Sequence, residues 1–215
     1  MTRIRLRDAA TLAQACYKAR EIRSPRIVDS LDKSGVQAHL TENGILLLPG
    51  SNSVLDYLHF NLRVFNVGHK KYRLSDGTTE RGASGTRWHQ GFLVYSRIVH
   101  GWMGARRPRL IIGHSLGAAA TQILSKSYNV HGIGFASPRP KKGGGRVRHD
   151  DKCLSICRVD DTVCAMAPNF NHLGQAKFLE PPAANFGMDH SMENYRKILD
   201  SNKGPDRIPE SWPFS

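Results

Sequence analysis

The chain is poor in the features that mark membrane-spanning and disulfide-rich proteins. None of its apolar runs reaches the roughly 18 residues that a transmembrane helix requires. No apolar stretch follows the basic start of the sequence, so we expect no secretory signal peptide in this chain and a cytoplasmic location. The four cysteines include no CxxC pair and predict free thiols in a reducing compartment; they are Cys16, Cys153, Cys157 and Cys164.

Acidic residues are also scarce. The 215 residues include 18 Asp and Glu against 31 Lys and Arg, which gives a net charge of +13. This balance favours anionic partners such as nucleic acid or an anionic membrane surface. The sequence has no helix-turn-helix, zinc-knuckle or RNP-type aromatic pattern, so nucleic-acid binding is the weaker interpretation. No cluster of metal ligands is present, and we expect neither a metal nor a cofactor.

Hydrophobic residues make up 40% of the chain, which is enough for the core of one domain of this length. Predicted strands and helices alternate, which indicates an α/β fold with a mostly parallel central sheet flanked by helices. We expect a compact single domain over residues 1–215, in which residues 1–30 form an N-terminal helical extension. The predicted strands are residues 36–40, 45–48, 63–67, 109–112, 130–136 and 154–159, and the predicted helices are residues 8–22, 54–62, 90–103, 118–128 and 191–199. Residues 68–88 and 140–149 are predicted loops.

One motif carries chemistry. The sequence Gly113-His114-Ser115-Leu116-Gly117 has the form G-x-S-x-G and lies between a predicted buried strand and a predicted helix. In this context the motif forms a strained turn that exposes the serine, and the glycines are needed because a Cβ would collide with neighbouring elements. The pattern therefore predicts Ser115 as a nucleophile. The alternative is a glycine-rich turn with a structural serine, which the flanking strand and helix disfavour.

A nucleophilic serine needs a histidine base and an acid that orients it. In α/β-hydrolase order, the acid and then the histidine follow the serine. Asp160 and Asp161 both follow a predicted strand, so either could supply the acid. His190 precedes the last predicted helix and is the favoured base, with His172 as its rival.

The oxyanion hole requires two backbone N–H groups. We expect one from Leu116, directly after the nucleophile, and one from Ser51, in the loop after the most apolar strand. An apolar stripe on residues 54–62 includes Leu55 and Leu58. We interpret these as a lid or pocket wall that contacts substrate, while simple packing on the core is an equal alternative.

Several ordered pieces of the sequence together resemble one family, the class 3 (fungal-type) lipases of the α/β-hydrolase fold. The resemblance spans most of residues 45–199. Its pieces are residues 45–62 around the oxyanion loop, the His-Gln-Gly-Phe of residues 89–92, the serine motif at residues 113–118, Gly-Phe-Ala-Ser-Pro-Arg at 134–139, Arg-Val-Asp-Asp-Thr-Val at 158–163, and Asp189-His190 followed by Tyr195.

This resemblance implies a serine carboxylester hydrolase that acts on lipid esters, as a triacylglycerol lipase or esterase. A phospholipase that acts on anionic membrane lipids is the alternative. It also implies that Ser115 is the nucleophile, His190 the base and Asp161 the acid, because Val163 aligns with the family's Asp-x-Val segment. Ser51 and Leu116 would then be the oxyanion donors. Neither the residues nor the resemblance specifies an oligomeric state.

Overall fold

The centre of the molecule is a seven-stranded sheet. The computed structural model describes residues 2–50, 64–181, 183, 190–201 and 208–214. In spatial order the strands are β14 (Gln175–Leu179), β12 (Cys153–Arg158), β10 (His131–Phe135), β9 (Leu110–His114), β4 (Ile45–Leu48), β3 (Val36–Thr41) and β2 (Ile27–Lys33). The strands from β14 to β4 are parallel, and β3 pairs antiparallel with both β4 and the edge strand β2.

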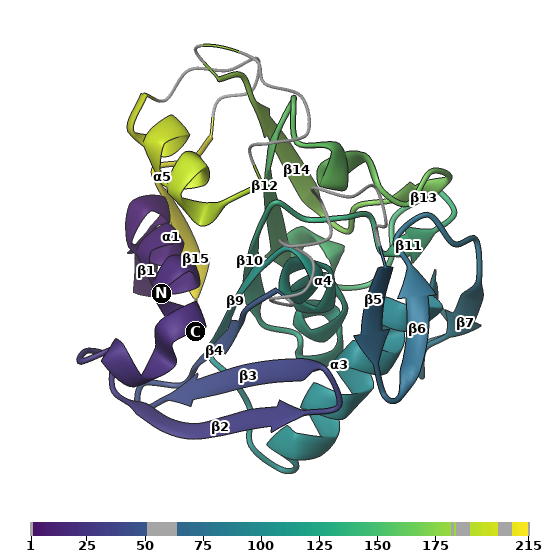
Figure 1. The fold of residues 1–215 in the computed structure, drawn as a ribbon, viewed down its shortest axis with the longest axis horizontal. Coiled ribbons are helices and arrows are strands. Elements are labelled where there is room, and N and C mark those ends of the chain that lie inside the picture. The colour runs from purple at the N-terminus through teal and green to yellow at the C-terminus, as the bar shows by residue number, and fades with distance from the viewer. Residues whose placement is uncertain (1, 51–63, 182, 184–189, 202–207, 215) are drawn as a thin grey trace.

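Helices cover both faces of this sheet. On one face α1 (Leu6–Ala15) packs against α5 (Met192–Ser201), and on the other α3 (Gln90–Met103) packs against α4 (Leu116–Tyr128). Figure 1 shows the two pairs on opposite sides of β9, β10 and β12. The predicted α/β fold with a mostly parallel, helix-flanked sheet in a compact single domain is therefore confirmed.

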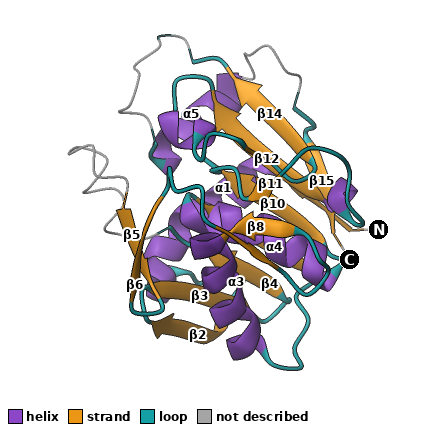
Figure 2. Cartoon of the chain, turned by 90° about the vertical axis from the view of Figure 1, so that its right-hand side faces the viewer, coloured by secondary structure: helices purple, strands orange, loops and turns teal. Residues whose placement is uncertain are grey.

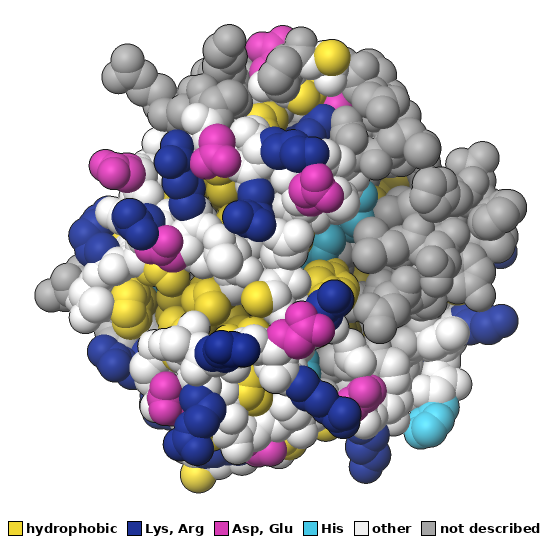
Figure 3. All heavy atoms as spheres, turned by 60° about the vertical axis from the view of Figure 1, so that its left-hand side comes forward, with side chains coloured by type: hydrophobic (Ala, Val, Ile, Leu, Met, Phe, Trp, Pro, Cys, Tyr) yellow, Lys and Arg dark blue, Asp and Glu magenta, His cyan; other side chains and the backbone are white. Residues whose placement is uncertain are grey.

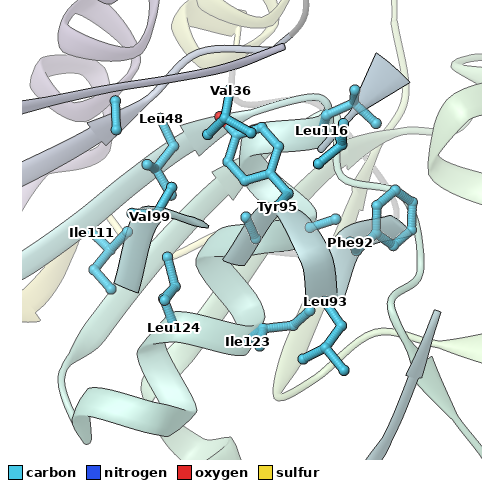
Figure 4. Packing of buried hydrophobic residues seen from close by; sticks show 14 of the residues in the cluster. Val36, Leu48, Phe92, Leu93, Tyr95, Val99, Ile111, Leu116, Ile123 and Leu124 are labelled. Atoms are coloured by element: carbon cyan, nitrogen blue, oxygen red, sulfur yellow. The ribbon is translucent and has the colours of Figure 1, made fainter. Parts of the chain in front are cut away.

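Alternation along the strands divides the core into two parts. Successive side chains of a strand point to opposite faces. Accordingly, Leu46 and Leu48 of β4 belong to the cluster under α3 and α4, while Ile45 and Leu47 belong to the cluster under α1 and α5. Figure 4 shows the first cluster, where side chains from both helices converge on the strands. A strand buried on both faces has no polar alternation, which explains the run of four apolar residues in β4.

Shorter strands surround the central sheet. β1 (Thr2–Arg5) pairs with β15 (Ser211–Phe214), and β5 (Val64–Val67) forms a hairpin with β6 (Lys70–Arg73). A four-stranded sheet has the order β13 (Phe170–Asn171), β11 (Lys141–Lys142), β8 (Arg87–His89) and β7 (Thr79–Arg81). Figure 2 shows β2 and β3 beside α3, far from β14 at the other edge of the central sheet.

Several predictions of secondary structure need correction. The predicted loop at residues 68–88 contains β6, β7 and the start of β8, and the predicted loop at residues 140–149 contains β11. These strands have only two to four residues each, too few to show a period of two. The predicted N-terminal helical extension over residues 1–30 also contains β1 and the first residues of β2. The predicted helix at residues 8–22 is instead α1 followed by a 3₁₀ segment, η1 (Cys16–Glu21), which is interrupted where Lys18 has non-helical backbone angles. The predicted helix at residues 54–62 lies outside the described residues.

The described residues bear on the predictions about cysteines and charge. All four cysteines are buried and free, as predicted, while the cytoplasmic location stays a prediction. Within the described part of the chain, no helix combines the length and apolar character needed to cross a bilayer. On the face shown in Figure 3, Lys and Arg side chains are spread among Asp and Glu rather than gathered into one basic patch.

We predict that truncating the centre of β4 strongly destabilises the protein. Leu47 is fully buried between β3 and β9, so Leu47→Ala should lower the free energy of unfolding by about 2–5 kcal/mol. Val28 on the edge strand β2 is 50% exposed, so Val28→Ala should change the free energy of unfolding by less than about 0.5 kcal/mol. Urea unfolding measures both values, and equal losses would contradict the assignment of Leu47 to the core.

Candidate functional site

The serine motif forms a strained turn between β9 and α4. Ser115 has φ 56° and ψ −124°, a conformation that few residues with a side chain adopt, and its N–H donates to the carbonyl of Phe135 at 3.0 Å. A Cβ at Gly117 would overlap the Leu48 carbonyl, and a Cβ at Gly113 would overlap the backbone of Gly117. The two motif glycines therefore let α4 approach the sheet closely enough to hold the turn.

The structure brings the serine together with the predicted histidine and aspartate. His190 Nε2 lies 2.8 Å from Ser115 Oγ, and His190 Nδ1 lies 2.9 Å from Asp161 Oδ2. All three side chains are buried. An ionised carboxylate can only accept, so Nδ1 carries the proton and donates to Asp161. Nε2 is then left as the acceptor of the Ser115 hydroxyl proton.

Asp161 is held as a carboxylate by its neighbours. Its Oδ2 also accepts the Tyr195 O–H at 2.8 Å, and its Oδ1 accepts the Val163 N–H at 2.9 Å. Burial by itself would raise the pKa of Asp161. The charge of His190 and the hydrogen bonds from His190, Tyr195 and Val163 outweigh burial and lower the pKa to about 2. Asp161 therefore remains ionised at any ordinary working pH.

The rival side chains point elsewhere. Asp160 accepts two hydrogen bonds from the Arg158 guanidinium, at 3.0 and 2.9 Å, in a buried ion pair. This pairing engages both carboxylate oxygens of Asp160 and leaves Asp161 as the acid beside His190. His172 instead lies against Phe178, and its Nε2 is 4.0 Å from the Cys157 sulfur.

A second network, which sequence reasoning missed, lies on the other side of His190. The pKa of His114 is lowered to about 3, by burial and then by the charge of His190, so the ring is neutral. Its Nε2–H donates to the His190 carbonyl at 2.9 Å, and its Nδ1 accepts the Tyr17 O–H at 2.6 Å. The Tyr17 oxygen in turn accepts the Gly50 N–H at 2.8 Å. Tyr17 is one of several polar residues on a predicted helix, and no local pattern distinguishes it.

This network restricts the candidates for oxyanion donors. The Gly50 N–H is engaged by Tyr17 and is not available to a substrate oxygen. The Leu116 N–H lies in the first turn of α4, where helix geometry leaves N–H groups without intrahelical acceptors. Ser51, Leu55 and Leu58, the other residues predicted to contact substrate, lie outside the described residues.

His89, which belongs to one piece of the family resemblance, has a structural role. His89 is fully buried; its Nε2 donates to the Arg73 carbonyl at 3.1 Å, and its ring packs on Phe92. His89 therefore supports the packing between α3 and the β5–β6 hairpin. Within the described ranges, no group of three or more His, Cys, Asp or Glu side chains is arranged to hold a metal ion.

Comparison with known proteins gives a likeness in fold. No protein-family model and no curated protein sequence matches the chain. Among solved structures, Lip2 lipase from Yarrowia lipolytica has a TM-score of 0.61 at 14% identity, over 92% of this chain and 92% of that chain. The Rhizomucor miehei lipase–propeptide complex has a TM-score of 0.57 at 14% identity, over 89% of this chain and 76% of that chain. Lipase II from Rhizopus niveus has a TM-score of 0.57 at 14% identity, over 86% of each chain. These fungal lipases confirm the predicted α/β-hydrolase fold.

We predict that Asp161 makes stability fall in acid. Its pKa is lowered from 3.8 to about 2 on folding, so its contribution is present above about pH 4 and is lost as the pH falls towards 2. Urea unfolding at pH 5 and pH 2 should show wild type losing about 2 kcal/mol more than Asp161→Asn over this range. Tyr195→Phe removes one donor and should show an intermediate loss, whereas identical losses in wild type and Asp161→Asn would contradict the role of this carboxylate.

Proposed function

We propose that the chain is a serine carboxylester hydrolase that acts on lipid esters through Ser115, His190 and Asp161. The observation that carries the proposal is the continuous chain of hydrogen bonds from Ser115 Oγ through both ring nitrogens of His190 to Asp161 Oδ2. A serine poised on a strained turn, a base within hydrogen-bond reach and an acid that fixes the base's tautomer together support nucleophilic acyl transfer.

The proposed reaction proceeds in two steps. Ser115 Oγ attacks the ester carbonyl while His190 Nε2 takes its proton, and His190 then returns that proton to the leaving alcohol. Asp161 stays ionised and stabilises the imidazolium that forms, without accepting its proton. A water molecule, activated by the same histidine, attacks the acyl-enzyme and releases the carboxylic acid.

Charge develops on the former carbonyl oxygen during both steps. We assign the oxyanion hole to the backbone N–H groups of Leu116 and Ser51. The place of Leu116 in the first turn of α4 supports the first assignment, because donors there combine free N–H groups with a favourable helix dipole. The anchoring of Gly50 by Tyr17 supports the second, since it holds the residue before Ser51 against the serine turn.

Lipid esters are the proposed substrate class. The solved structures with the same fold are described as lipases, and the sequence resembles their family in ordered pieces. We propose triacylglycerols or simpler carboxylesters as substrates, with Leu55 and Leu58 as substrate contacts. Phospholipids of anionic membranes are the second candidate, which the net charge of +13 favours.

We predict that hydrolysis depends on Ser115 and on no other buried serine. Ser115→Ala should lower kcat on p-nitrophenyl esters by at least about 10⁴-fold and abolish labelling by an active-site-directed phosphonate. Ser155→Ala is the matched control, since its buried hydroxyl has no hydrogen-bond partner in the described structure and its removal should leave kcat unchanged.

The same assay, run with p-nitrophenyl esters of increasing acyl-chain length, distinguishes a lipase from an esterase. A rise in kcat/KM towards long, emulsified chains would support a lipase, and a preference for short soluble esters would support an esterase. Turnover or labelling that survives in Ser115→Ala would overturn the proposed function.

We also predict that the positive charge contributes to binding at anionic lipid surfaces. Binding to vesicles that contain phosphatidylserine should weaken as the salt concentration rises from about 10 to 150 mM, because the Debye length falls from about 30 to 8 Å. Neutral phosphatidylcholine vesicles provide the control. Sedimentation of vesicle-bound protein measures the effect, and binding that is independent of salt would exclude this role.

A further inference from the structure

A cavity remote from the serine turn lies where α3 and α4 meet the loops at residues 82–84 and 148–149. Its volume is 440 Å³, within the range of about 300–1,000 Å³ that small-molecule sites occupy. Its floor is apolar and consists of Trp88, Leu93, Ile123 and Leu124. Figure 4 shows Leu93 of α3 and Ile123 of α4 next to each other in this part of the core.

Cationic side chains form one side of this cavity. Lys126 of α4 is only 8% exposed, and its Nζ donates to Ser84 Oγ at 3.0 Å. Arg148 donates from Nε to His149 Nε2 at 3.1 Å, and the other ring nitrogen of His149 donates to the Lys126 carbonyl at 3.3 Å. These contacts hold Lys126 and Arg148 on the same side of the cavity.

Among the described residues that line the cavity, no carboxylate faces Lys126 or Arg148, because none of them is acidic. The third cation on its wall, Arg97, is already paired with Glu80. Burial and then the nearby charge of Arg148 lower the pKa of Lys126. A buried ammonium that faces another cation is unfavourable unless an anion joins them.

We propose that this cavity binds an amphiphile with one carboxylate, whose charged end contacts Lys126 and Arg148 and whose apolar chain covers Trp88 and Ile123. The combination of an apolar floor and a cationic rim is complementary to such a molecule. A free phosphate would contact the two cations but would leave the apolar floor uncovered. The proposal rests on this cavity alone and does not depend on ester hydrolysis.

Decanoate below its micellar concentration is the probe, and the indole N–H resonance of Trp88 is the local readout. The chain has three tryptophans, so Trp88→Phe identifies the signal. We expect decanoate to shift this resonance in a saturable manner, and calorimetry to give the dissociation constant. Decanol, which lacks the charge, and inorganic phosphate, which lacks the chain, should each bind at least about tenfold more weakly.

Lys126→Met removes the charge but keeps the length of the side chain, and it should weaken decanoate binding at least about tenfold. Arg148→Gln, at an exposed position, should weaken decanoate binding severalfold. Arg146→Gln is the matched control, because this arginine belongs to the same loop, is 86% exposed, pairs with Asp150 and does not line the cavity.

Three results would overturn the proposal. One is a Trp88 resonance that decanoate leaves unmoved. Another is decanoate binding of equal strength in wild type, Lys126→Met and Arg148→Gln. The last is phosphate binding as tight as that of decanoate, which would indicate an anion site that makes no use of the apolar floor.

Discussion

The close approach of α4 to the carboxyl end of β4 is the constraint on which the site depends. Gly117 allows this approach because a side chain there would overlap the Leu48 carbonyl. The turn that joins β9 to α4 must then be sharp, and Ser115 takes a positive φ. The same approach brings the start of α4 to the edge of the sheet where the parallel strands end, the edge at which open α/β sheets bind ligands. One contact between backbones thus sets the position of Ser115 and of the first N–H groups of α4.

Burial then determines how the polar groups around His190 behave. Inside the protein each hydrogen bond is stronger than in water, but each unpaired polar group is more costly. Both carboxylate oxygens of Asp161 accept hydrogen bonds. Its partner Tyr195 in turn accepts the backbone N–H of Arg158. Burial raises the pKa of Tyr195 well above its ordinary value, and burial does the same for Tyr17. Tyr17 and Tyr195 therefore stay neutral at the two ends of the network, where each donates a hydrogen bond without losing its proton.

The sequence predicts those elements whose signals are local. The helix α3 coincides with residues 90–103, because its apolar residues recur at helical spacing, and β4 is recognised by its unbroken apolar run. The side chains of Ser115, His190 and Asp161, which the chain order and the family resemblance single out, lie within hydrogen-bond distance in that spatial order. The edge strand β14 was missed because its exposed and half-buried residues lack a period of two.

Pairings between distant segments could not be predicted in the same way. Tyr17 and His114 are separated by 97 positions, and their hydrogen bond follows from the packing of the N-terminal segment beside the sheet. The residues alone leave the choice between Asp160 and Asp161 open, and only the family resemblance favours Asp161; in the structure the Arg158 guanidinium pairs with Asp160. Such choices depend on the folded environment of a side chain, which neither composition nor spacing encodes.

The packing of α1 against α5 has a consequence for the order in which the structure folds. α5 follows directly after His190 and carries Tyr195, and it docks on a helix made from the first residues of the chain. Contacts between such distant segments form late, because closing a long loop costs entropy before any contact compensates for it. His190 therefore comes to lie beside Ser115 only once this long-range contact has formed, later than the local turn that positions the serine.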